Sequence, residues 1–212
     1  MSSSSPTATD QPSSTVAALL QARRDKLAKL QELGIDPWGS RFDDAHAVEK
    51  VRKQGDSIAQ DADDGPTVRV AGRIMLLRNA GRLVFLDLVD RTGRIQVMIG
   101  KKQVGADIWP VVGCLDLGDI IGVEGRLGYS NSGEMTIFAS SLTFLTKSLE
   151  TPPDKYHGLV DPELRQRMRY LDLIHGEGVR DRFVARSKII EAIRRVLTDR
   201  GFLEVEGPTL QE

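Results

Sequence analysis

Hydrophobic and polar side chains alternate along the middle of the chain. Residues 82–99 read RLVFLDLVDRTGRIQVMI, and every second position on either side of DRTG is a large aliphatic residue. These positions are Val84, Leu86, Leu88, Ile95, Val97 and Ile99. Because successive side chains of a β-strand point to opposite faces, the alternation predicts two strands that share one buried face. DRTG provides a turn of about four residues, so the segment is expected to form a β-hairpin.

Similar patterns surround the hairpin. The stretch TVRVAGRIMLLR predicts a strand before it, with Gly72 at a bend or bulge, and QVGADIWPVVGCL predicts a short irregular helix broken near Pro110. Two further strands, DIIGVEGRLGYS and EMTIFASSLTFLT, are expected on either side of the tight turn NSG. Three strands, a helix and two strands over residues 67–147 form the element order of a five-stranded OB-fold barrel. We therefore expect a mainly β protein with flanking helices.

Helical periodicity flanks this barrel segment. From Val16 the apolar residues recur at steps of three and four, and Gly34 is placed to end that helix. A second short helix is expected around residues 44–54. After the barrel, a helix is predicted to start at Pro162 behind Asp161 as its N-cap.

The C-terminal part predicts one long amphipathic helix over about 179–200, ended by Gly201. Its buried face is expected to hold Val179, Phe183, Ile190, Ile193 and Leu197. The following GFLEVEGPTLQE is expected to begin as a strand. These patterns divide the chain into a disordered tail (1–15), a helical extension with an acidic linker (16–66), the barrel (67–147), a connector (148–178) and a C-terminal segment (179–212).

Composition narrows the class of protein. The formal net charge is −1, but residues 67–147 carry ten Arg and Lys against seven Asp and Glu, which points to a polyanionic partner. The single cysteine, Cys114, excludes an internal disulfide, fits a reducing compartment and is expected to be buried. No stretch approaches the roughly 18–20 apolar residues of a membrane span, and the N-terminus lacks a signal-peptide core. We expect a cytoplasmic protein without membrane contact.

The sequence does not predict a bound metal. The three histidines are far apart and have no ligand partners at metal-binding spacing. They are His46, His157 and His175.

One large aromatic residue interrupts the polar face of the hairpin. Phe85 shares that face with Arg82, Asp87, Arg94 and Gln96. OB-fold barrels bind single-stranded nucleic acid on their second and third strands, where bases stack on exposed aromatic rings. Phe85 is therefore interpreted as a stacking surface, and the Gln96 amide as a group that can donate to and accept from a pyrimidine edge. The alternative is that Phe85 packs as ordinary core beneath the N-terminal helix or a loop.

From RRDKLAKLQELGIDPW to its C-terminus, the chain resembles bacterial class II lysyl-tRNA synthetases. The barrel matches through VAGRIM, FLDLVDRTGRIQV, LGDIIGVEGRL and SGEMTI. The stretch PDKYHGLVDPELRQRMRYLDLI is similar to the lysyl branch and separates it from aspartyl and asparaginyl relatives. After VARSKII, the stretch GFLEVEGPTL resembles motif 1 of class II synthetases, with Pro208 at the motif's proline position and Gly207 where a threonine is usual.

The resemblance implies that the barrel binds the anticodon stem-loop of lysine tRNA, and no DNA. It assigns Phe85 to stacking on the central anticodon base, Gln96 to the edge of that base, and Arg78 to a base or backbone contact. Glu134 matches a glutamate that helps to read an anticodon uridine. For Arg78 and Glu134 the alternative is a solvated charge at the end of a strand.

Further basic residues have two interpretations each. Four arginines of the barrel rim could contact phosphate or be solvated: Arg73, Arg82, Arg94 and Arg126. The N-terminal helix carries Arg23, Arg24, Lys26 and Lys29, which in the family can lie near tRNA but which a helix packed on the barrel also explains. The run ELRQRMRY is similar to the family's connection into the catalytic domain, so a role in hinge and dimer packing is expected.

Motif 1 builds a dimer interface in the family. The resemblance therefore implies a homodimer through residues 179–212, with Gly201, Phe202 and Pro208 in the interface. In full-length relatives, motifs 2 and 3 use ATP and Mg²⁺ to charge tRNA with lysine through lysyl-adenylate. Neither motif occurs in these 212 residues. We therefore expect no catalytic residue and no bound cofactor here, and no aminoacylation by this chain alone.

The sequence is compatible with three functions. The preferred interpretation is a fragment of a lysine–tRNA ligase that binds tRNA, because the sequence stops soon after motif 1. The first alternative is a free-standing OB-fold module that binds nucleic acid. The second is an interaction protein that dimerises through residues 179–212 and regulates a full-length synthetase.

Overall fold

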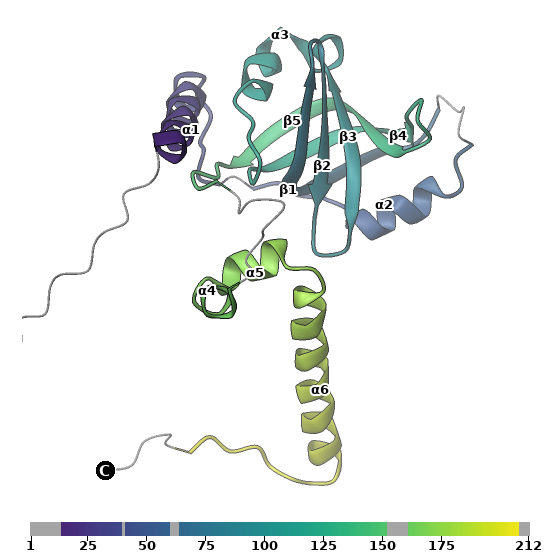
Figure 1. Ribbon diagram of the computed structural model, residues 1–212. Coiled ribbons are helices and arrows are strands. Elements are labelled where there is room, and N and C mark those ends of the chain that lie inside the picture. Colours follow the sequence, from purple (N-terminus) through teal and green to yellow (C-terminus); the bar gives the residue numbers. More distant parts are fainter. Residues whose placement is uncertain (1–13, 40, 60–63, 152–160, 208–212) are drawn as a thin grey trace, which may run out of the picture. The chain divides into compact units, whose positions relative to one another are not determined.

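The computed structural model describes residues 14–39, 41–59, 64–151 and 161–207 (Figure 1). The chain divides into two compact units, Met1–Pro152 and Pro153–Glu212. The first unit contains a β-barrel with helices around it, and the described residues of the second unit are mainly helical.

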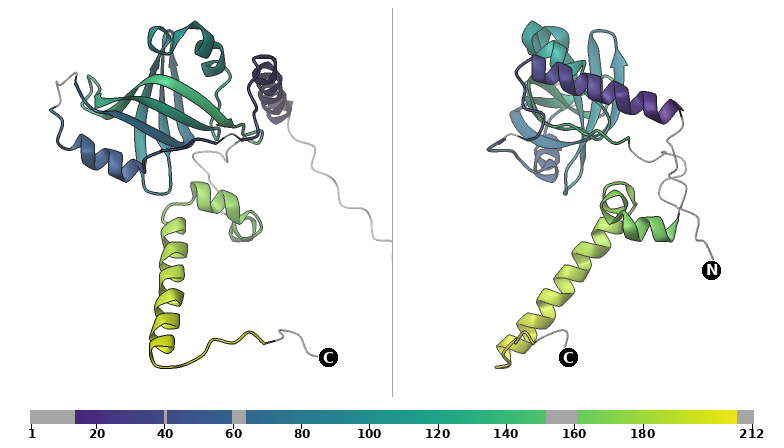
Figure 2. Two further views of the ribbon diagram at one scale, coloured as in Figure 1. Left: turned by 180° about the vertical axis from the view of Figure 1, so that it is seen from behind. Right: turned by 90° about the vertical axis from the view of Figure 1, so that its left-hand side faces the viewer.

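Five strands of the first unit close into a barrel (Figures 1 and 2). They are β1 (Thr67–Ala80), β2 (Leu83–Val89), β3 (Arg94–Gly100), β4 (Ile120–Tyr129) and β5 (Met135–Thr146). The order around the barrel is β1-β2-β3-β5-β4, and all pairs are antiparallel except β3 with β5, which is parallel. Helix α3 (Lys101–Val112) lies between β3 and β4 in the chain. This arrangement confirms the predicted OB-fold.

The predicted hairpin is formed by β2 and β3, and its aliphatic face points into the barrel. All six residues predicted for that face are at most 4% exposed. They pack in one core with inward residues of the other strands, such as Val70 and Ile137. Because each such side chain contributes about 1.5–3 kcal/mol when fully buried, this face fixes the register of the hairpin.

The bulge of β1 lies elsewhere than the sequence pattern predicts. The register shifts between Ile74 and Leu76, and not at Gly72. Gly72 instead marks a close approach of two strands, since a Cβ atom there would lie 2.9 Å from the carbonyl oxygen of Val89. The glycine therefore allows β1 and β2 to approach each other, and the bend follows it in the chain.

Helix α3 also differs from the prediction. It is interrupted at Gly105, where φ is 84°, and not near Pro110. This backbone conformation is accessible to glycine at little cost, whereas other residues rarely adopt it. Pro110 lies inside the helical segment that follows. The next turn contains Cys114, which is buried as expected.

Two basic side chains attach helix α1 (Ser14–Glu32) to the barrel. Arg23 donates hydrogen bonds to the carbonyl oxygens of Leu117 (3.0 Å) and Ser148 (2.8 Å). Lys26 forms an ion pair of 2.6 Å with Asp116. Two of the four basic residues that could have approached tRNA are thus used in packing, which favours the packing interpretation of this helix.

A buried ion cluster lies next to this attachment. The Nζ atom of Lys147 donates to carboxylate oxygens of Asp116 (2.7 Å) and Asp119 (2.8 Å), and also to the carbonyl oxygen of Cys114 (3.0 Å). The side chains of Lys147 and Asp119 are completely buried. Asp119 also accepts hydrogen bonds of 2.8 Å from the backbone N–H groups of Asp116 and Ser148. Burial raises the pKa of Asp119, while the hydrogen bond and charge of Lys147 act in the opposite direction.

Helix α2 (Val48–Gly55) is tied to the hairpin turn. The backbone N–H of Val48 donates to a carboxylate oxygen of Asp90 at 2.9 Å, and Val48 and Val51 are fully buried. The other oxygen of Asp90 accepts from the N–H groups of Thr92 (2.6 Å) and Gly93 (2.9 Å). One carboxylate therefore holds the start of the helix and the turn together.

We expect protonation of Asp90 to destabilise the first unit in acid. Burial alone would raise the pKa of Asp90, but the hydrogen bonds from α2 and from its own turn outweigh burial and lower that pKa. Such a carboxylate stabilises the fold above its unfolded pKa of about 4, and this contribution is lost as the pH falls through the lower folded value. Asp90→Asn should lower the free energy of unfolding by about 1 kcal/mol at neutral pH. It should also flatten the dependence of that free energy on pH below about 4.

Urea unfolding provides the measurement for Asp90. Both tryptophans of the chain, Trp38 and Trp109, belong to the first unit, so their fluorescence follows the unfolding of that unit. A variant with the same acid dependence as the parent protein would contradict the assignment.

The second unit contains α4 (Pro162–Arg167), α5 (Arg169–His175) and α6 (Val179–Asp199). As predicted, Asp161 caps α4, and its side chain accepts a hydrogen bond of 2.9 Å from the N–H of Glu163. Buried Asp172 forms ion pairs with Arg165 (2.7 Å) and Arg169 (2.6 Å) and so joins α4 to α5. Burial alone would raise the pKa of Asp172, but the two guanidinium groups outweigh it and lower that pKa.

Helix α6 does not bury the apolar face that the sequence predicted. Val179, at its first turn, is buried, whereas Phe183, Ile193 and Leu197 are at least 41% exposed. A helix buries its apolar stripe only where another element covers it, and no other described helix of this unit packs on the middle or the end of α6. Only the segment around 202–204 lies beside its end, where Glu204 pairs with Arg194. None of the described helices is long and apolar enough to cross a membrane.

The segment after α6 also differs from the prediction. Gly201 has φ 85° and ends the helix as expected, but residues 202–207 are irregular and form no strand. A strand needs a hydrogen-bonded neighbour, and no strand of the described residues pairs with this segment. Pro208 lies outside the described residues.

Candidate nucleic-acid interface

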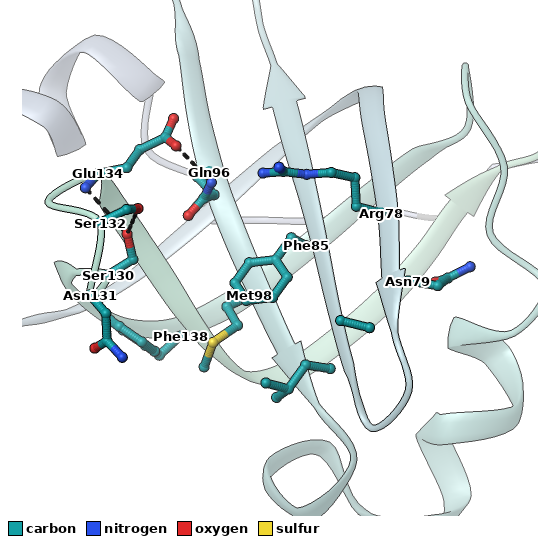
Figure 3. Close-up of a pocket in the computed structure, with 12 residues that line it drawn as sticks. Arg78, Asn79, Phe85, Gln96, Met98, Ser130, Asn131, Ser132, Glu134 and Phe138 are labelled. Carbon is teal, nitrogen blue, oxygen red and sulfur yellow. Dashed lines mark hydrogen bonds between the residues drawn. The ribbon is translucent and has the colours of Figure 1, made fainter.

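A pocket of about 730 Å³ hollows the outer surface of the barrel (Figure 3). It extends over β1, β2, β3 and β5 and is bounded by the turn between β4 and β5. Its lining residues are Arg78, Asn79, Ala80, Leu83, Phe85, Gln96, Met98, Ser130, Asn131, Ser132, Glu134 and Phe138. The four residues that the resemblance assigned to anticodon binding are all among them. The fold therefore brings together, on one surface, residues that are up to 56 positions apart, from Arg78 to Glu134.

Phe85 lies half-buried on the outer face of β2. Directly opposite it are Arg78 on β1 and Met98 on β3. The hydrogen bonds of helix α1 to the barrel are made at residues 115–117 and 148, away from this surface. The ring of Phe85 therefore faces the pocket, and it is not covered by the N-terminal helix.

Gln96 lies deeper than its neighbours, at 4% exposure. Its Nε2 donates to Glu134 at 2.8 Å, and its Oε1 accepts a hydrogen bond of 2.8 Å from the hydroxyl of buried Thr136. Figure 3 shows the contact with Glu134 at the edge of the pocket. A primary amide has two N–H donors and two acceptor lone pairs, so these two bonds use half of its capacity and orient the rest.

Glu134 joins the β4–β5 turn to the face of β3. Its backbone N–H donates to the hydroxyl of Ser130 at 3.2 Å, and Gly133, at φ 78°, donates to the carbonyl of Ser130 at 2.8 Å. The Glu134 carboxylate also lies 3.5 Å from a guanidinium nitrogen of Arg94, which forms a second ion pair of 3.2 Å with Asp87. The turn thus holds a carboxylate with a defined orientation beside Gln96.

Arg78 is exposed and lies on β1 at the far side of the Phe85 ring from Met98. Its side chain extends from β1 toward β2 (Figure 3). Positive charge therefore lies on one side of the ring, and the amide and carboxylate of Gln96 and Glu134 lie on the other.

The four further arginines of the barrel rim do not form one group. Arg73 donates to the carbonyl oxygen of Gly118 at 2.7 Å and does not line the pocket. Arg82 is exposed in the β1–β2 turn, ahead of β2, and so does not share the strand face of Phe85 that the sequence pattern predicts for it. Arg94 contacts Glu134 at the edge of the pocket, and Arg126 lies on β4 above the ring of Phe138. Contacts of these arginines with phosphate stay predictions.

Eight of the twelve lining residues were not among the sequence-based candidates, and Met98 and Phe138 are two of them. Met98 follows Gln96 on the same face of β3, so its place in the pocket could have been predicted from the period-two alternation of the strand. Phe138 lies on β5 and reaches the pocket through the parallel pairing of β3 with β5, in which it is opposite Met98. Among the described residues, no group of three or more His, Cys, Asp and Glu side chains is arranged to hold a metal ion.

Comparison with known proteins agrees with this geometry. The model of the OB-fold nucleic acid binding domain family matches residues 68–145, and that of the class II tRNA synthetases for D, K and N matches residues 161–212. The lysine–tRNA ligase of Bacillus subtilis (strain 168) is 44% identical to the chain over 193 residues, which cover 90% of the chain. Over most of its length the chain is similar to bacterial lysine–tRNA ligases. Lysine–tRNA ligases of Moorella thermoacetica and Enterococcus faecalis are 43% and 45% identical over 91% and 89% of the chain.

The similarity to these ligases covers only part of their length. The chain spans 39% of the Bacillus subtilis ligase and 38% of each of the other two. The two family models match all but the first and last residues of the barrel and all three described helices that follow it. The similarity therefore bears directly on the barrel surface that carries the pocket.

Proposed function

We propose that this chain is the anticodon-binding part of a lysine–tRNA ligase, and that its barrel binds the anticodon loop of lysine tRNA. The observation that carries the proposal is the convergence of Arg78, Phe85, Gln96 and Glu134 on one pocket. The relation to lysine–tRNA ligases supports the choice of tRNA over other nucleic acids.

The pocket offers complementary chemistry to an unstacked base. The Phe85 ring provides a face for stacking, which is worth roughly 1–3 kcal/mol per base. The unused N–H and lone pair of Gln96 can pair with the donor and acceptor on a uridine edge, and single-stranded loops are the part of RNA that exposes such edges. The Glu134 carboxylate orients the Gln96 amide, and Arg78 supplies positive charge for the backbone. In this proposal Phe85 receives the central anticodon base.

We assign lysine activation to parts of the ligases that this chain does not span. In the family that step uses ATP and Mg²⁺ to form lysyl-adenylate. The described residues do not provide a fitting site, because they contain no cluster of metal-ligating side chains and no glycine-rich phosphate loop. We therefore derive no catalytic step from them.

We further propose that the second unit contributes to a homodimer of the complete ligase in the cytoplasm. Its exposed apolar side chains support this, since Ile193 is 55%, Phe202 is 64% and Leu203 is 85% exposed. Such a surface is typical of a segment that packs against another chain or domain. Gly201 separates α6 from Phe202 and turns the chain there.

Titration with RNA hairpins tests the proposed function. We expect the purified chain to bind a fluorescent anticodon stem-loop of lysine tRNA more tightly than the same hairpin with its central anticodon uridine replaced by cytidine. The reason is that cytidine presents an amino donor where uridine presents the acceptor O4, and an acceptor nitrogen where uridine presents the donor N3–H, so the oriented Gln96 amide loses both partners. Fluorescence anisotropy at two salt concentrations gives both dissociation constants.

The control distinguishes base recognition from charge. A surface that contacts only phosphate groups would bind both hairpins with equal affinity, and that affinity would fall steeply with salt concentration. That result would favour a free-standing nucleic-acid-binding module. Absence of binding to both hairpins would favour a protein partner, such as a full-length synthetase, and would contradict the proposal.

A further inference from the structure

One row of outward-facing side chains runs across four adjacent strand pairs of the barrel. In the register of these strands, each member lies directly opposite the next. The row consists of Arg78 (β1), Phe85 (β2), Met98 (β3), Phe138 (β5) and Arg126 (β4). It therefore has an aromatic ring on each side of a thioether and a guanidinium group at each end. The proposed anticodon site uses only the half of this row on β1 and β2.

The other half of the row borders a second hollow. It has a volume of about 320 Å³, and its lining residues are Thr67, Met98, Gly100, Gln103, Arg126, Phe138, Ala139 and Ser140. Met98 and Phe138 line both hollows, so the two are continuous across these side chains. The second hollow offers hydroxyl and amide groups from Thr67, Gln103 and Ser140 beside the aromatic ring, which suits the polar groups of a nucleotide.

The ring of Phe138 is held in place from one side. The guanidinium carbon of Arg126 lies 4.4 Å from the centre of the ring. Gly128, on the same strand as Arg126, leaves the space for this arrangement, since a Cβ atom there would lie 2.9 Å from Arg126 Nη1 and 3.3 Å from the ring. Stacking on an arginine fixes the orientation of an aromatic side chain and places a positive charge next to it.

We propose that Phe138 and Arg126 form a second nucleotide subsite, in which Phe138 stacks on another base of the loop bound at Phe85. This inference rests on the proposed function. Phe85 and Phe138 are two strand spacings apart, which is about 10 Å. Successive stacked bases are only about 3.4 Å apart. The two bases are therefore splayed apart, as the bases of single-stranded RNA are when proteins recognise them. The charge of Arg126 then lies beside the RNA backbone, either between these two nucleotides or just after the second one.

Abasic hairpins test this subsite. The probes are the lysine anticodon stem-loop and a set of derivatives, each lacking one loop base. We expect the full chain to bind two of these derivatives more weakly than the intact hairpin: the one that lacks the central anticodon base and one that lacks another loop base. Phe138→Ala should bind the intact hairpin about five- to 150-fold more weakly. It should be insensitive to base removal at that second position and still sensitive at the central one, and Phe85→Ala should show the opposite pattern.

Two results would overturn the subsite. One is that Phe138→Ala binds the intact hairpin as tightly as the wild-type chain does. The other is an equal loss of affinity for every hairpin, which would indicate a general effect on the barrel. In either case the wild-type chain would still lose affinity when the central base is removed, and Phe85→Ala would not, so the proposed function would stand. If the wild-type chain bound all hairpins equally, this result would contradict the proposed function itself.

Matched variants keep the test interpretable. Phe183 in the second unit is also exposed and has a guanidinium group, that of Arg169, 5.4 Å from its ring centre. Phe183→Ala should therefore leave hairpin affinity unchanged. Phe138→Leu keeps an apolar side chain on the barrel and removes only the flat ring, and it should show the same abasic pattern as Phe138→Ala.

The salt dependence of binding tests the role of the Arg126 charge separately. Arg126→Gln should reduce the slope of log affinity against log salt by about 0.7, the value for one phosphate contact on a single strand. Phe138→Ala should leave that slope unchanged, because it removes no charge. An unchanged slope in Arg126→Gln would exclude Arg126 from the subsite.

Discussion

Replacing Phe85 by alanine will lower the affinity for the lysine anticodon stem-loop about five- to 150-fold, or about 1–3 kcal/mol. The ring is half-buried on the outside of the barrel and lines the pocket, so a base can cover its free face. Alanine removes the stacking surface and leaves Gln96 and Glu134 in place. The measurement is the dissociation constant by fluorescence anisotropy, with tryptophan fluorescence as a check on the fold.

A conservative variant separates stacking from packing. Phe85→Tyr keeps an aromatic face, so it should retain most of the affinity that Phe85→Ala loses. If alanine bound the hairpin as tightly as phenylalanine, the ring would have no part in recognition. If tyrosine were as weak as alanine, the shape of the site and not stacking would explain the loss.

Replacing Asp119 by alanine will lower the free energy of unfolding of the first unit by about 3–5 kcal/mol, the cost of removing one partner from a buried ion pair. Asp119 is fully buried and accepts hydrogen bonds from Lys147 and from two backbone N–H groups. Alanine leaves those N–H groups without acceptors. It also leaves Lys147, whose side chain is fully buried, with Asp116 as the remaining carboxylate.

A double variant tests the cause of this loss. Lys147→Met in the Asp119→Ala background removes the buried charge that the single variant leaves poorly compensated. We therefore expect the double variant to be more stable than Asp119→Ala, although two side chains have changed. Urea unfolding followed by tryptophan fluorescence provides the comparison. Additive losses from the two substitutions would mean that the pair has no special coupling.

Local patterns in the sequence were sufficient to predict the hairpin and the residue at the centre of the pocket. Val84, Leu86 and Leu88 repeat with period two, and a register slip would expose all three, so their pattern determines which face is buried. Phe85 stood out because it is a large ring on an otherwise polar face. Both signals lie within one hairpin, and they do not depend on what the rest of the chain does.

Features that depend on distant partners were not predictable in this way. Phe138 comes beside Met98 only because β3 and β5 pair in parallel, and no local pattern in either strand specifies that pairing. Lys147 looked like one more basic residue of the barrel, since charged residues are seldom fully buried. Its burial requires Asp116 and Asp119 from another loop. The apolar stripe of α6 had the correct period, but periodicity alone does not identify what covers a helix.

The parallel pairing of β3 with β5 also determines when the barrel can form during synthesis. Residues 96–99 of β3 pair with residues 136–139, so α3 and β4 must both be translated before β3 receives its second neighbour. Until then β1, β2 and β3 form a meander with an open edge on β3, and such edges can pair with other chains. Closure over so long a sequence separation is entropically costly and slow. We therefore expect nascent chains that stop before β5 to depend on chaperones more than the completed barrel does.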